Sequence, residues 1–115
     1  MSYRKSDQRA AQRVPLRLFV DHILGEQDRC LCVTENLSRD GLRLAGHPQN
    51  GWGQPRHVWL EFQLPDGDER SIRALGELRY EGLTAGGMRS RGFRFKYMAP
   101  RAKRRYEAFL AADVN

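Results

Sequence analysis

The sequence predicts a mostly β fold, a six-stranded antiparallel β-barrel with a C-terminal α-helix over one opening. Apolar and polar residues alternate in six short segments, and Gly, Pro and Asp separate these segments. After Pro100 the apolar period becomes that of an amphipathic helix. With 115 residues and 40% hydrophobic content, the chain can bury one core, so we expect one domain.

The first three strands are predicted between Val14 and Gly46. Pro15 restricts the first of them to an edge or a strand start. Asp40-Gly41 predicts the tight reversal between the second and the third. Their core faces consist of alternate aliphatic residues: Leu16, Leu18 and Val20, then Leu31, Val33 and Leu37, then Leu42 and Leu44.

The remaining elements follow a loop rich in Gly and Pro. A strong turn at residues 65–68 separates the fourth and fifth strands, and Pro100 takes the favoured first position of the helix. The predicted core faces of these strands are Val58, Leu60, Phe62 and Leu64, then Ile72, Ala74, Gly76, Leu78 and Tyr80, then Phe93, Phe95 and Tyr97. The predicted apolar stripe of the helix is Ala102, Tyr106, Phe109 and Leu110.

The chain divides into two parts of different character. Residues 1–13 are polar and without periodicity, so we expect a flexible basic arm, whereas residues 14–115 carry the barrel and the helix. The net charge is +6, and 17 of the 20 cationic residues are Arg. Arg makes planar, bidentate contacts with phosphate and base edges, so the composition predicts an anionic partner or a generally basic surface.

The sequence predicts neither a catalytic site nor a metal site. Cys30 and Cys32 would lie about 6.6 Å apart on one side of a strand, an awkward geometry for a disulfide. His22, His47 and His57 lack the spacing of metal ligands, and no catalytic triad or phosphate-cradling glycine loop occurs. With no signal-peptide pattern and no apolar run of spanning length, we expect a cytoplasmic protein without membrane insertion.

Two short motifs near the N-terminus suggest a binding site. RAAQR contains Arg9 and Arg13, and NLSRDG contains Asn36, Ser38 and Gly41. Four Arg pairs with the first spacing occur in this Arg-rich chain, so that pair alone carries little information. The composition predicts only about 0.04 chance matches to the second motif, which therefore carries most of the weight.

The residues of the two motifs match the chemistry of a guanine nucleotide. Arg9 and Arg13 could bind the O6 and N7 acceptors of guanine or pair with phosphate. Asn36 and Ser38, on one side of a strand, could bind the opposite guanine edge, and Gly41 permits a positive φ or a close backbone approach to a ligand. Solvated Arg side chains followed by an ordinary hairpin turn would explain the same residues equally well.

RAAQRVPLRL followed by TENLSRDGLRL resembles the PilZ domain, the bacterial receptor module for cyclic di-GMP. GELRYEG, RGFRFKYMAP and the final helix resemble later parts of the same family, so the resemblance covers nearly the whole chain. It implies a six-stranded barrel with the ligand on its outer surface. Arg9 and Arg13 would contact phosphates and one guanine, Asn36 and Ser38 the other guanine, and Gly41 completes the second motif.

The leading interpretation is therefore a non-enzymatic receptor that binds cyclic di-GMP, changes conformation and regulates an unidentified partner protein. The resemblance implies no cofactor besides that ligand. The alternative is a small basic β-barrel that binds RNA or single-stranded DNA, which is disfavoured because most aromatic residues take predicted core positions. A third interpretation, a degenerate module for protein interaction only, is opposed by the intact motifs.

Three further features stay outside the predicted site. Tyr80 lies where some PilZ domains carry an aromatic residue that stacks on guanine, but a core or surface position explains it equally well. Asp40 is expected to be a turn residue that faces away from an anionic ligand. Four cations should form a basic helix face, more simply solvated than bound to a partner: Arg101, Lys103, Arg104 and Arg105.

Overall fold

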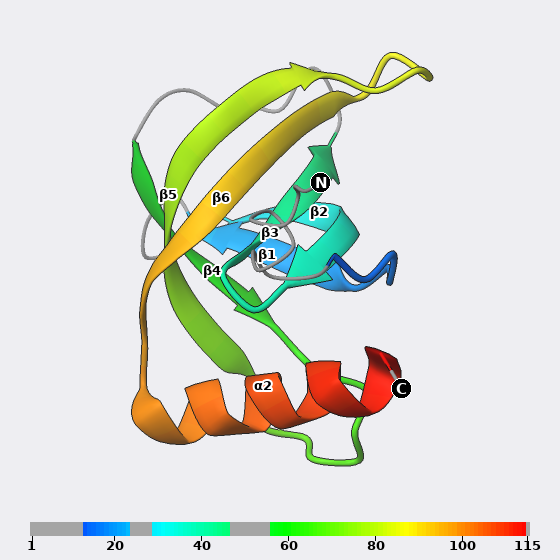
Figure 1. The fold of residues 1–115 in the computed structure, drawn as a ribbon. Helices are drawn as coiled ribbons and strands as arrows, with labels where there is room; N and C mark the ends of the chain where they lie inside the picture. The colour runs from blue at the N-terminus through cyan, green and yellow to red at the C-terminus, as the bar shows by residue number, and fades with distance from the viewer. Residues whose placement is uncertain (1–12, 24–28, 47–55, 115) are drawn as a thin grey trace, which may run out of the picture.

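Six antiparallel strands close into a barrel in the order β1-β2-β3-β6-β5-β4, and one helix lies across its lower end in Figure 1. The computed structural model describes residues 13–23, 29–46 and 56–114. The elements are β1 (Phe19–Ile23), β2 (Arg29–Ser38), β3 (Gly41–Gly46), β4 (His57–Phe62), β5 (Ile72–Leu83), β6 (Arg89–Met98) and α2 (Pro100–Val114). The predicted barrel with its C-terminal helix is confirmed.

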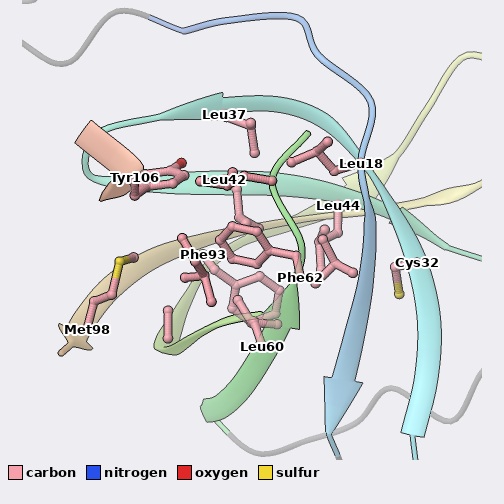
Figure 2. Packing of buried hydrophobic residues seen from close by; sticks show 14 of the residues in the cluster. Leu18, Cys32, Leu37, Leu42, Leu44, Leu60, Phe62, Phe93, Met98 and Tyr106 are labelled. Atoms are coloured by element: carbon pink, nitrogen blue, oxygen red, sulfur yellow. The ribbon is translucent and has the colours of Figure 1, made fainter. Parts of the chain in front are cut away.

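The hydrophobic core fills the barrel and continues to the inner face of α2 (Figure 2). The predicted alternation is confirmed for β1, β3, β4 and the helix. The buried residues on these elements and the segments beside them include Leu18, Val20, Leu42, Leu44, Val58, Leu60, Phe62, Leu64, Tyr106 and Leu110. Burial of this apolar surface is the main stabilising contribution to the fold.

The predicted core face of β2 is wrong in its first half. Leu31 is 59% exposed and Val33 is half-buried, whereas Cys32 takes the core position between them. One extra residue, Glu35, lies where the register of β2 against β3 shifts. Such a bulge reverses the face on which later side chains lie, and Leu37 beyond it is fully buried as predicted.

Two further bulges turn aromatic side chains outward. Register shifts between β5 and β6 leave Arg79 as an extra residue on β5 and Lys96 as an extra residue on β6. Tyr80 and Tyr97, which the alternation places on core faces, are therefore 43% and 54% exposed. The alternation of residues along one strand cannot predict a bulge, because a bulge depends on how that strand pairs with its neighbour.

The segment before β1 is extended but forms no regular strand, so the first strand begins at Phe19 rather than at Val14. Val14 makes an isolated bridge with Leu37 through two backbone hydrogen bonds of 2.7 and 2.9 Å. The buried hydroxyl of Thr34 accepts the backbone N–H of Leu18 at 2.7 Å. These contacts hold the entering chain against β2 without a continuous ladder.

Tyr106 ties the helix to the end of β2. Its hydroxyl donates to the backbone carbonyl of Ser38 at 2.7 Å, and its ring packs edge-on against Phe62 and Phe95. Figure 2 shows this side chain beside Leu42. Burial raises the pKa of Tyr106, so the phenol stays protonated and remains a hydrogen-bond donor.

Arg105 clamps the helix to the loop between β4 and β5. Its guanidinium binds both carboxylate oxygens of Asp66 at 2.8 and 3.0 Å and also donates to the carbonyls of Asp68 and Arg70. Hydrogen bonding from Arg105 lowers the pKa of Asp66 below its ordinary value. The expectation of a uniformly solvated helix face is therefore wrong at Arg105, whose side chain is 15% exposed.

Several predictions from the sequence concern residues outside the described part of the chain. These are the flexible arm, of which only Arg13 is described, and His47. Within the described residues, no three His, Cys, Asp or Glu side chains are placed to hold a metal ion. No helix in the same part of the chain is long and apolar enough to cross a membrane.

We expect Arg105→Ala to lower the melting temperature at pH 7, because it removes the contacts with Asp66 and the loop carbonyls. Arg104→Ala, on the exposed side of the same turn, is the matched control and should leave it nearly unchanged. The folded pKa of Asp66 is lowered, so its stabilising contribution is present above about pH 3.8 and is lost as the pH falls further. Thermal unfolding should show a smaller difference between the two variants in acid than at pH 7, and identical melting at pH 7 would contradict the clamp.

Candidate ligand-binding site

The two sequence motifs meet beside the end of β2. Nη1 of Arg13 donates a hydrogen bond to Oδ1 of Asn36 at 2.8 Å. The bridge between Val14 and Leu37 permits this contact, because it holds the entering chain alongside β2 within reach of a long side chain. Arg9 lies outside the described residues, so its place in the site stays a prediction.

Ser38 and Gly41 shape the turn that follows Asn36. Ser38 is buried, and its hydroxyl donates to the carbonyl of Gly41 at 3.3 Å. Among the described residues, positive φ is confined to Gly67 and Gly87, so a positive φ at Gly41 is wrong. A Cβ at Gly41 would instead overlap the carbonyl oxygen of Phe93, so the close approach is to β6 rather than to a ligand.

A hollow of about 400 Å³ opens on the outer surface of the barrel next to this turn. It spans β3, β6 and β5, which are neighbours in the barrel. Its lining consists of Arg13, Asp40, Gly41, Arg43, Arg79, Tyr80, Gly92, Phe93 and Arg94. The hollow therefore places Arg13 next to residues of β3, β5 and β6. Most of these residues lie outside the two sequence motifs.

Arg43 and Tyr80 form a flat platform in this hollow. Gly92 on β6 pairs with Arg43 on one side and with Tyr80 on the other. Because Gly92 has no side chain, the guanidinium of Arg43 can cross β6 and lie 4.3 Å from the centroid of the Tyr80 ring. The stacked pair offers a planar surface of the kind on which a nucleobase packs.

The charges in the hollow are strongly unbalanced. Four Arg side chains line it, and the carboxylate among them is that of Asp40. Burial lowers the pKa of Arg13 and the nearby Arg43 lowers it further, although the guanidinium remains charged at neutral pH. Asp40 also lines the hollow, and the expectation that its carboxylate faces away stays a prediction. The surplus of cations favours an anionic ligand.

Six lining residues lie outside the sequence motifs, and four of these carry charged or polar side chains: Arg43, Arg79, Tyr80 and Arg94. The sequence pointed to one of these four, since Tyr80 lies where some PilZ domains carry an aromatic residue that stacks on guanine. The bulge at Arg79, which exposes Tyr80, has no comparable signal in the sequence.

The cysteines lie elsewhere, on β2, and both carry free thiols. Burial raises the pKa of Cys32 to about 12, so its thiol is protonated and a poor nucleophile at neutral pH.

The sequence matches the PilZ domain family over residues 7–112. The chain belongs to this family. The resemblance to this family is thus confirmed. The matched residues include both motifs, the barrel and most of the helix. No curated protein matches this PilZ domain in sequence.

Solved structures share the fold of this PilZ domain at low sequence identity. The inhibitor of motility MotI (DgrA) of Bacillus subtilis aligns with 99% of the chain at a TM-score of 0.74 and 17% identity. YcgR of Escherichia coli in complex with c-di-GMP aligns with 91% of it at a TM-score of 0.65 and 16% identity. The chain spans about half of these two proteins, 51% and 45%.

The PilZ domain of YcgR with c-di-GMP, in contrast, is matched over nearly its whole length. The alignment covers 97% of the present chain and 98% of that domain, with a TM-score of 0.62 and 13% identity. At such identities the similarity establishes the shared barrel and helix.

We expect Gly41→Ala to destabilise the PilZ domain, because the new Cβ would meet the backbone of β6 and force β3 away. Overpacking of this kind costs about 1–3 kcal/mol, equivalent to a fall in melting temperature of about 5–15 °C for a domain of this size. Gly86→Ala is the matched control, since its nearest neighbour would be the Thr84 hydroxyl at 3.9 Å. Equal melting temperatures of the two variants would show that β3 tolerates a side chain at Gly41.

Proposed function

We propose that this PilZ domain is a receptor that binds cyclic di-GMP and thereby regulates a partner protein. The observation that carries the proposal is the hydrogen bond between Arg13 and Asn36, which joins the two motifs at an arginine-lined hollow. Two of the structural relatives were solved with c-di-GMP. The role is that of a sensor, and no step of chemistry on the ligand is proposed.

The phosphates would be bound by arginines. Arg13 would pair with one of them, and Arg9 from the N-terminal arm would close over the same ligand. Charge-assisted hydrogen bonds between guanidinium and phosphate are about twice as strong as neutral ones. An anion would also relieve the repulsion between Arg13 and Arg43 that lowers the pKa of Arg13.

The guanine bases would be bound in two ways. The amide oxygen of Asn36 accepts one hydrogen bond from Arg13 and has a second lone pair, which could accept a donor from the guanine edge. The Arg43–Tyr80 platform could stack on a purine face. In this proposal Ser38 and Gly41 act mainly by holding the turn, because the Ser38 hydroxyl is buried and directed at the Gly41 carbonyl.

The proposed site distinguishes cyclic di-GMP from other nucleotides by its duplicated guanine and phosphate contacts. Titration calorimetry with cyclic di-GMP, GTP and cyclic di-AMP should show the tightest binding for cyclic di-GMP. Ligand at about 100 times Kd should add roughly 2.7 kcal/mol to the free energy of unfolding, a rise in melting temperature of order 10 °C. Folded protein that shows no heat and no melting shift at saturating cyclic di-GMP would refute the proposal.

We expect Arg13→Ala to weaken cyclic di-GMP binding by about ten- to a hundredfold, because a charge-assisted bond is worth about 1.5–3 kcal/mol. The fold should be retained, since the Arg13 side chain is exposed. Arg17→Ala is the matched control, because Arg17 is an exposed arginine on the same segment that does not line the hollow. If the two variants bind alike in calorimetry, Arg13 is ordinary surface charge.

A further inference from the structure

A second hollow, of about 510 Å³, adjoins the candidate nucleotide site on the side of the helix. It lies between the β2–β3 turn, the end of β6 and the first turns of α2. Asp40 and Arg94 line both hollows, so the two hollows are adjacent at these residues. Its charged lining residues are Arg39, Asp40, Arg94, Lys96, Lys103 and Glu107.

The charges of this second hollow are poorly neutralised. Four cations and two carboxylates leave a net charge of +2. Within the described residues, Arg39, Arg94 and Lys103 take part in no ion pair, and Lys96 is 3.9 Å from a carboxylate oxygen of Glu77. A contact of that length contributes little, because it lies at the outer limit of an ion pair and Lys96 is exposed. Most of the positive charge is thus free to attract an anion.

Helix α2 adds to the positive potential rather than offsetting it. Acidic residues are stabilising near the positive end of a helix, yet the first turn of α2 contains none and Lys103 follows directly. The backbone N–H of Lys103 donates to the carbonyl of Ala99, which marks the start of the helix. An arrangement that weakens the helix while strengthening the field of the hollow is expected where an anion binds.

We infer that this second hollow is a docking site for an acidic segment of a partner protein. A polypeptide can place Asp or Glu opposite the cations and leave other positions neutral, so that it avoids Asp40 and Glu107. A nucleic-acid strand carries a phosphate at every nucleotide and would meet both carboxylates. Two aromatic residues line the hollow. Phe95 packs against Tyr106, at 5.5 Å between ring centroids, whereas Tyr97 is 54% exposed, so the two carboxylates and not the aromatic rings argue against a nucleic-acid strand. The acidic-segment site stands beside the proposed nucleotide receptor and does not depend on it.

The test uses the full chain and a fluorescein-labelled peptide of eight glutamates, followed by fluorescence anisotropy at low salt. The double variant Lys96→Glu, Lys103→Glu should bind the peptide at least tenfold more weakly, or about 1.4 kcal/mol. Arg17→Glu with Arg56→Glu is the matched control, because both residues are exposed, lie outside the second hollow and give the same change in net charge. This control should change the affinity less than twofold.

Both double variants should fold. Lys103→Glu replaces a cation near the positive end of α2 by an anion, which favours the helix, and Lys96 is exposed. Melting curves check this, and Lys96→Gln with Lys103→Gln repeats the test with a smaller charge change. Neither lysine lines the candidate nucleotide site, so cyclic di-GMP titration of the same variants reports on the nucleotide proposal separately.

Two outcomes would overturn the inference. Equal weakening by the hollow variant and the control variant would show general attraction between a basic protein and an acidic peptide. Tighter binding of a labelled eight-nucleotide oligothymidylate than of the peptide, lost in the hollow variant, would assign the surface to nucleic acid instead.

Discussion

The contact between the backbones of β3 and β6 at Gly41 is the constraint on which the rest of the site depends. With no side chain at Gly41, β3 packs directly against the Phe93 carbonyl, and the next backbone contact follows, from the Phe95 N–H to the Asp40 carbonyl at 2.8 Å. This close pairing of β3 with β6 places Arg43 opposite Gly92, so that its guanidinium lies over the ring of Tyr80. One missing Cβ thereby determines the position of the turn and of the platform beside it.

The same turn connects the candidate site to the helix. Ser38 lies two residues after Asn36 in the second motif, and its carbonyl accepts a hydrogen bond from the hydroxyl of the buried Tyr106. At the other side of the helix, Arg105 holds the loop between β4 and β5. A displacement of the turn on ligand binding would therefore act directly on a hydrogen bond to α2, without a long chain of intermediate contacts.

The arginines of this protein fall into two groups that differ in how far nearby carboxylates neutralise them. Arg105 is neutralised by carboxylates, donates hydrogen bonds to loop carbonyls and stabilises the fold. Arg13, Arg43 and Arg94 gather at one surface where a single carboxylate lines the hollow with them. Concentrating like charges in this way opposes folding slightly but prepares a surface for an anion, because a bound anion removes the repulsion.

The sequence by itself determined the architecture, because alternating core residues on β1, β3 and β4 and the stripe on α2 are local patterns that burial enforces. The RAAQR and NLSRDG motifs likewise indicated the family, while the ligand site that they suggest stays a prediction. Only the tertiary structure decided which residues join them. Bulges at Glu35, Arg79 and Lys96 arise from pairing with partner strands and change which side chains face outward. The stacking of Arg43 on Tyr80 and the burial of Ser38 depend on strands that are distant in sequence, so no local pattern could specify them.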